Sequence, residues 1–135
     1  MISVNKNKII LVVDDSSANL QLCRGLLGGE YDVRLVKSGK IALEALTRIK
    51  PDIILLDIEM PGMSGFDVIT ELNADSGLRA IPVIFVTSHA TEKLVAKAAE
   101  LGASDYVVKP VEAGVLRGKI RNCLKKRRID VKITV

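Results

Sequence analysis

The sequence is poor in aromatic residues and in cysteine. It has no tryptophan and only two tyrosines and two phenylalanines among 135 residues, so its core must consist mainly of aliphatic side chains. Cys23 and Cys123 lie a hundred residues apart, which is neither a disulfide framework nor the spacing of a metal-binding knuckle. We therefore expect two reduced thiols in a cytoplasmic protein.

Long apolar segments are absent too. The longest runs, such as residues 53–56, are far shorter than the roughly 20 residues that span a bilayer, and residues 1–8 lack the apolar core of a signal peptide. The formal net charge is +4, and all of it comes from residues 125–135, which carry five basic side chains and one acidic. The other 124 residues have a net charge of zero. We therefore expect no nucleic-acid surface and no membrane contact over the body of the chain.

Five short apolar segments alternate with five segments of helical periodicity. Three of the apolar segments contain no polar residue, as is typical of strands covered on both faces. Such an alternation, with right-handed crossovers, predicts one doubly wound α/β domain with a parallel sheet and helices on both faces. The predicted strands are 9–13, 32–36, 53–56, 83–86 and 106–108, and the predicted helices are 17–27, 40–49, 66–73, 92–101 and 115–126.

Small residues mark several predicted helix ends. Ser64 can cap the start of the third helix, and Gly28 and Gly102 follow the first and fourth helices, where a left-handed residue is favoured. Beyond the last helix, residues 129–135 alternate apolar with polar side chains, which is typical of a strand. We therefore divide the chain into a domain over residues 1–127 and a tail over residues 128–135, either a linker stub or an extra strand.

Polar residues follow four of the five predicted strands. Asp14 and Asp15 come after the first strand, Asp57 after the third, Thr87 after the fourth and Lys109 after the fifth. Each alone could be a helix cap or a surface residue, but ligands of open α/β sheets bind beyond the carboxyl ends of the strands. Carboxylates that converge there repel one another unless they are protonated or bridged by a cation. A hard divalent cation, most simply Mg²⁺, would resolve that conflict.

The glycine-rich loops of nucleotide-binding sites are missing from this edge. The loop after the first strand reads Asp-Asp-Ser-Ser-Ala-Asn instead of G-x-G-x-x-G, and no G-x-x-x-x-G-K-[ST] motif is present. An anion could therefore approach only through a metal ion. These residues predict that the metal holds a phosphoryl group while Asp57 attacks phosphorus to form an aspartyl phosphate, with Lys109 supplying a fixed positive charge.

Four ordered motifs resemble those of the response-regulator receiver domains of two-component signalling systems. The resemblance runs from residue 8 to about residue 125, and it implies a flavodoxin-like fold with the strand order 2-1-3-4-5. It also implies a signalling domain that catalyses only its own phosphorylation and dephosphorylation. The motifs are residues 12–15 (VVDD), 55–65 (LLDIEMPGMSG), 86–88 (VTS) and 102–110 (GASDYVVKP).

The resemblance implies a role for each residue at the strand ends. Asp57 is expected to accept a phosphoryl group from a phosphohistidine on a sensor histidine kinase or phosphotransfer protein. Asp14 and Asp15 match the metal-binding pair, with Asp15 as the direct ligand, and the backbone carbonyl of Glu59 is the expected third protein ligand. Lys109 matches the phosphate-contacting lysine, which precedes a cis proline in the family.

The resemblance also implies a switch. Thr87 matches the hydroxyl that turns toward the phosphoryl group, and Tyr106 matches the aromatic residue that then moves inward. Together they would couple Asp57 to the face formed by the fourth helix, the fifth strand and the fifth helix, where a downstream effector or a second copy in a homodimer would bind. Glu59 and His89 occupy positions that influence acyl-phosphate hydrolysis in the family, so we hypothesise that they set the phosphoryl lifetime.

Other classes of function compete with this interpretation. A haloacid-dehalogenase-like phosphatase also uses an aspartate nucleophile with Mg²⁺, but its nucleophile follows the first strand and its core usually carries a cap. An interaction module that is never phosphorylated would not need the acidic pair, the acceptor, the hydroxyl and the lysine together. Nucleic-acid binding through residues 125–128 has little support, because basic residues at a helix end interact favourably with the helix dipole.

Overall fold

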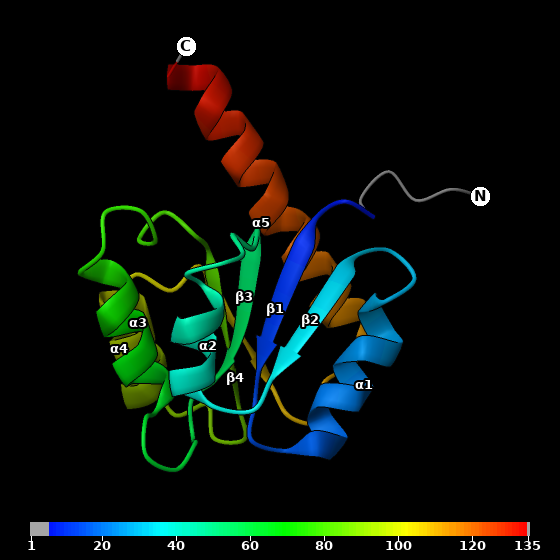
Figure 1. Cartoon of the computed structure of the whole chain (residues 1–135), viewed down its shortest axis with the longest axis vertical. Helices are drawn as coiled ribbons and strands as arrows, with labels where there is room; N and C mark the ends of the chain where they lie inside the picture. The colour runs from blue at the N-terminus through cyan, green and yellow to red at the C-terminus, as the bar shows by residue number, and fades with distance from the viewer. Residues whose placement is uncertain (1–5, 135) are drawn as a thin grey trace.

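Five parallel strands form one sheet in the order β2-β1-β3-β4-β5, with helices on both faces (Figure 1). The computed structural model describes the backbone of residues 6–134 and the side chains of residues 6–126. This is the predicted doubly wound fold and strand order. The strands are β1 (Ile9–Val13), β2 (Asp32–Val36), β3 (Ile53–Asp57), β4 (Val83–Thr87) and β5 (Asp105–Val108), and the helices are α1 (Ser17–Leu27), α2 (Gly39–Ala45), α3 (Gly65–Asn73), α4 (Glu92–Glu100) and α5 (Ala113–Thr134).

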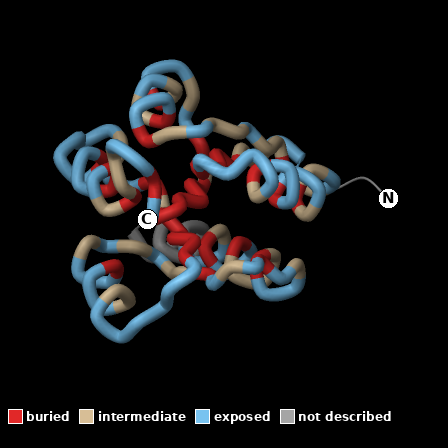
Figure 2. The backbone as a smooth tube through the Cα atoms, turned by 90° about the horizontal axis from the view of Figure 1, so that it is seen from below, coloured by how far each residue is buried: buried red, intermediate tan, exposed pale blue. Residues whose placement is uncertain are grey.

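Successive residues of the central strands point to opposite faces of the sheet and enter two separate cores. On β1, Ile10 and Val12 pack in the core formed with α1 and α5, whereas Leu11 and Val13 pack in the core formed with α2, α3 and α4. Figure 2 shows buried backbone at the centre of the molecule and along the inner sides of the surrounding helices. Burial on both faces explains why the central strands are apolar up to Asp57 and Thr87, the residues that end β3 and β4.

The register of the sheet aligns the carboxyl ends of its central strands. Val13 pairs with Leu56, Asp57 pairs with Val86, and Thr87 pairs with Val108. The residues that directly follow these strands therefore emerge at one edge, where their loops meet. This alignment positions the candidate site.

Side-chain oxygens cap the start of four helices, and the cap of α3 is Ser64, as predicted. Ser16, Ser38 and Ser64 accept hydrogen bonds from backbone N–H groups in the first turns of α1, α2 and α3, and Ser64 forms a reciprocal capping box with Asp67. The cap of α4 is Thr91. Thr87, the alternative cap considered from the sequence, is thus left available for another role.

The glycine and helix-end predictions were partly wrong. Gly102 adopts the expected left-handed conformation, with φ of 88°, but Gly28 stays right-handed, with φ of −63°, because its N–H still bonds the Arg24 carbonyl as in a continuing helix. Helix α2 ends at Ala45 instead of residue 49. The Thr47 hydroxyl donates to the Glu44 carbonyl, and this side-chain bond competes with the next helical turn.

Helix α5 is longer than predicted and projects beyond the domain (Figure 1). It continues to Thr134, so the strand, one of the two alternatives considered for the tail, was wrong for residues 129–134, and residue 135 is outside the described residues. No proline or glycine follows Gly118, so nothing stops the helical hydrogen-bond pattern. The division between residues 127 and 128 stays a prediction. None of the helices in the described part of the chain has the length and hydrophobicity that crossing a bilayer requires.

Candidate functional site

Three carboxylates meet at the carboxyl edge of the sheet. Asp14 and Asp15 follow β1, Asp57 ends the adjacent strand β3, and each offers an oxygen within 4.8 Å of the others. Asp14 and Asp57 are only 1% and 3% exposed, whereas Asp15 is exposed. The acidic residues that the sequence predicted to converge are therefore brought together. A set of oxygen ligands with two buried charges fits a hard divalent cation such as Mg²⁺.

Lys109 reaches the two buried carboxylates from the loop after β5. Its Nζ lies 3.1 Å from Asp14 Oδ2 and 3.4 Å from Asp57 Oδ1, and its peptide bond to Pro110 is cis, as expected. Burial alone would lower the pKa of Lys109, but the hydrogen bonds and charges of Asp14 and Asp57 raise that pKa overall. The ammonium group of Lys109 therefore stays protonated.

One lysine does not neutralise this cluster. Burial, followed by repulsion from Asp14, raises the pKa of Asp57 from its ordinary 3.8 to about 6, even though Lys109 and the backbone of Glu59 act in the opposite direction. An ionised Asp57 is thus held in an unfavourable environment without a further cation. A carboxylate in this position is suited to receive a metal ion and then an electrophile.

The orientation of Asp14 depends on a residue that sequence reasoning missed. Its Oδ1 accepts a hydrogen bond from the Ser16 backbone N–H at 2.9 Å, and its Oδ2 accepts one from the Asn19 side-chain amide. Asn19 lies in the first turn of α1, five residues after Asp14, so a local signal existed. The amide and Lys109 both contact Oδ2, which holds this carboxylate in one orientation beside Asp57.

Glu59, Thr87 and His89 form a second group at the same edge. Thr87 is fully buried, and its hydroxyl donates to Glu59 Oε1 at 3.2 Å while it accepts from the His89 backbone N–H at 3.0 Å. The His89 ring Nε2 lies 3.8 Å from Glu59 Oε2. Thr87, the predicted switch residue, thus contacts the side chain of Glu59 and the backbone of His89, the two residues predicted to set the phosphoryl lifetime.

Tyr106 lies on β5, two residues further from the carboxyl edge of the sheet than the partner of Thr87, Val108. It pairs in register with Phe85, two residues before Thr87 on β4, and its half-buried ring lines a surface cavity of about 280 Å³ with Val108, Val115 and Lys119. The Nζ of Lys119 lies 4.9 Å from the centre of the ring. The aromatic residue is therefore at the surface formed by β5 and α5.

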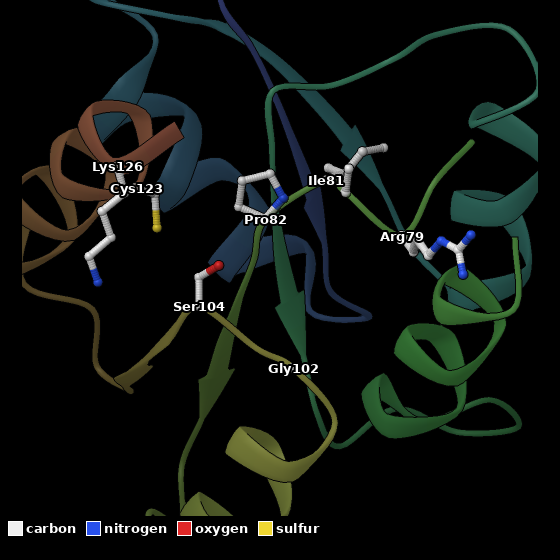
Figure 3. A pocket seen from close by; sticks show the side chains of 8 residues that line it. Arg79, Ile81, Pro82, Gly102, Ser104, Cys123 and Lys126 are labelled. Carbon is white, nitrogen blue, oxygen red and sulfur yellow. The ribbon is translucent and has the colours of Figure 1, made fainter. Parts of the chain in front are cut away.

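A separate cavity of about 230 Å³ lies at the opposite end of the sheet (Figure 3). Its walls come from the segments before β4 and β5 and from α5, and Cys123 and Ser104 point into it while Arg79 points away. None of the acidic residues of the site lines this cavity. This cavity is therefore separate from the carboxylate cluster at the carboxyl edge.

The response regulator receiver domain family matches residues 10–121 of this chain. The chain belongs to that family. The family match and the position of Asp57 on the third strand leave the phosphatase alternative without support.

Relatives and solved structures agree with the assignment of this receiver domain. It is 40% identical over 119 residues to a probable cyclic di-GMP phosphodiesterase of Vibrio cholerae, matching 88% of this chain and 27% of that protein, and 41% identical to the response regulator PleD of Caulobacter vibrioides, matching 84% and 25%. The signal receiver domain of a putative LuxO repressor protein from Vibrio parahaemolyticus superimposes with a TM-score of 0.86 at 30% identity, covering 94% of this chain and 97% of that one.

The receiver domain spans only part of the length of its curated relatives. It matches about a quarter of the two proteins above and about half of the DNA-binding response regulator MtrA of Mycobacterium tuberculosis, to which it is 36% identical over 87% of its own length. The names of these relatives describe different activities. Membership of the family therefore leaves the output of this chain open.

Proposed function

We propose that this receiver domain accepts a phosphoryl group on Asp57 with the help of Mg²⁺ and passes the signal to its α4-β5-α5 face. The observation that carries the proposal is the buried Asp57 carboxylate, which has Lys109 Nζ 3.4 Å away and offers an oxygen within 4.8 Å of oxygens of two further carboxylates. A signalling domain needs this chemistry only once per signalling event.

Each residue of the site has a defined task in the transfer. An Asp57 oxygen attacks phosphorus, the new P–O bond forms, and the bond from phosphorus to the imidazole nitrogen of a histidine kinase or phosphotransfer protein breaks. Lys109 places its positive charge beside the phosphoryl oxygens, and Asn19 and Ser16 keep Asp14 in place. Mg²⁺, held by Asp14, Asp15, Asp57 and the Glu59 backbone carbonyl, supplies the remaining positive charge when bound.

The response to phosphorylation would pass through Thr87 and Tyr106. The added phosphoryl charge attracts the Thr87 hydroxyl, and the ring of Tyr106 then moves from the surface cavity toward the vacated space. This changes the surface between α4, β5 and α5, where Val108 and Val115 are each 44% exposed. We propose that a downstream effector, or a second copy of the chain, binds this surface.

Glu59 and His89 are also proposed to set the lifetime of the aspartyl phosphate. Their side chains are 50% and 70% exposed and lie beside Thr87, where they can control the approach of water to phosphorus. Substituting each one singly by alanine and timing the loss of phosphate tests this role. Decay unchanged in both variants would contradict it.

The decisive experiment incubates the protein with Mg²⁺ and acetyl phosphate and then measures intact mass and molecular size. We expect one phosphoryl adduct per chain, lost in Asp57→Asn and after chelation of Mg²⁺, and strongly reduced in Lys109→Ala. Glu71→Gln, which alters an exposed carboxylate on α3, is the matched control and should label normally. An adduct that persists in Asp57→Asn or that forms without divalent metal would refute the proposal, and continuous hydrolysis of the donor without a retained adduct would favour a phosphatase.

A further inference from the structure

The hydroxyl proton of Thr87 already has a partner in the unphosphorylated protein. Thr87 is fully buried at the end of β4, and its oxygen accepts the His89 backbone N–H at 3.0 Å and lies 3.2 Å from Glu59 Oε1. A threonine hydroxyl has a single proton. Because the His89 N–H uses the acceptor side of the oxygen, that proton is directed at the Glu59 carboxylate.

Glu59 is placed to compete with a phosphoryl group on Asp57. It follows Asp57 by two residues on the loop after β3 and reaches across to the end of β4, 28 residues away in sequence. Its other oxygen, Oε2, lies 3.8 Å from the ring of His89. The carboxylate therefore bridges the loop that carries the phosphoacceptor and the loop that carries the switch hydroxyl.

We propose that Glu59 is a positioning residue that restrains Thr87 in the unphosphorylated conformation, so that phosphorylation must exchange one hydrogen-bond acceptor for another. This inference rests on the proposed function and adds the contact that opposes the switch. Phosphoryl oxygens only accept hydrogen bonds, so one hydroxyl proton cannot serve both them and Glu59. The negative phosphoryl group also repels the nearby Glu59 carboxylate, which helps to release the hydroxyl.

The first test measures the restraint without metal or phosphoryl donor. Urea unfolding is compared for wild type, Glu59→Ala, Thr87→Val and the double variant in EDTA. We expect the two residues to be coupled, with the unfolding equilibrium constants departing from multiplicativity by about three- to tenfold, as for a typical intramolecular hydrogen bond, because the Glu59 side chain is half exposed. Thr87→Ser keeps the hydroxyl and should keep the coupling. If the effects of Glu59→Ala and Thr87→Val on the unfolding equilibrium constant simply multiply in the double variant, the proposed restraint is overturned.

The second test measures its consequence for the switch. In a Tyr31→Phe background Tyr106 is the sole tyrosine, and the chain has no tryptophan, so tyrosine fluorescence reports on Tyr106. The protein is titrated with beryllofluoride in the presence of Mg²⁺, as a mimic of the phosphoryl group. We expect Glu59→Ala to lower the midpoint about three- to tenfold, as the hydrogen bond that must be broken is lost, while Glu71→Ala leaves it unchanged.

The Thr87→Val background separates the hydrogen bond from simple charge repulsion. There the gain from Glu59→Ala should largely disappear, because no hydroxyl remains to be released. An equal gain in both backgrounds, or no gain in either, would overturn the proposed restraint while the acceptor chemistry stands. A wild-type protein that takes up no beryllofluoride with Mg²⁺ would instead overturn the proposed function, and the metal-free unfolding cycle would still decide whether Glu59 and Thr87 are coupled.

Discussion

Removing the charge of Asp57 should stabilise the metal-free protein at neutral pH. The side chain is 3% exposed, and burial together with Asp14 raises its pKa from 3.8 to about 6. Because the folded state binds this proton more tightly than the unfolded chain does, protonated Asp57 favours folding. That contribution is complete below pH 3.8 and is lost as the pH rises through 6. Asp57→Asn has no charge to lose, and its side-chain oxygen can still accept from Lys109.

The size of the effect follows from the two pKa values. Their difference corresponds to at most about 3 kcal/mol, and solvent that reaches the edge of the site at the exposed Asp15 reduces this to about 1–2 kcal/mol. We therefore expect Asp57→Asn to unfold at a higher urea concentration than wild type at pH 7.5. Near pH 4 the two proteins should be nearly equal, and the gap should open between pH 4 and 7.

The assay is urea denaturation at 25 °C in EDTA, followed by circular dichroism at several pH values. Glu71→Gln removes an exposed charge from α3 and should show a gap close to zero throughout. Mg²⁺ at about 100 times its dissociation constant should stabilise wild type by about 2.7 kcal/mol and erase most of the advantage of the variant. If Asp57→Asn were no more stable than wild type at pH 7.5, or if its gain were equally large at pH 4, the electrostatic reasoning would be refuted.

Two further predictions concern the backbone under the site and the two thiols. Gly65→Ala should lower the free energy of unfolding by about 1–3 kcal/mol, because a Cβ there would lie 2.4 Å from the Asp57 carbonyl oxygen. Gly25→Ala in α1 meets open space and should raise that free energy by up to about 1 kcal/mol. Equal effects of the two variants in thermal unfolding would contradict the close packing at Gly65. Iodoacetamide should modify Cys123 before Cys23, as followed by peptide mapping. Cys123 lines a cavity, whereas Cys23 is fully buried and burial raises the pKa of its thiol to about 11. Modification in the reverse order would contradict this expectation.

Several features of this receiver domain could be read from short stretches of sequence. The bounds of β1 and β2 were predicted to the residue, because short segments rich in aliphatic and β-branched residues between turn residues signal strands. The serine before α3 caps it as predicted, since a cap needs only a side-chain oxygen next to the first helical N–H groups. The acidic and basic residues at the strand ends were also found, because parallel strands bring their carboxyl ends to one edge.

Features that depend on neighbouring elements needed the tertiary structure. The alternating pattern of residues 129–134 suggested a strand, but a strand requires a partner, and α5 simply continues through them. Gly28 was expected to be left-handed, yet its N–H remains bonded to Arg24.

The sequence by itself determined which groups carry the chemistry and on which loops they lie, because those signals are local. Only the folded chain decided that Glu59 holds the hydroxyl of Thr87, 28 residues away in the sequence. Side-chain contacts of this kind depend on the register between strands and on the course of each loop to within an ångström, and no spacing along the chain encodes that distance.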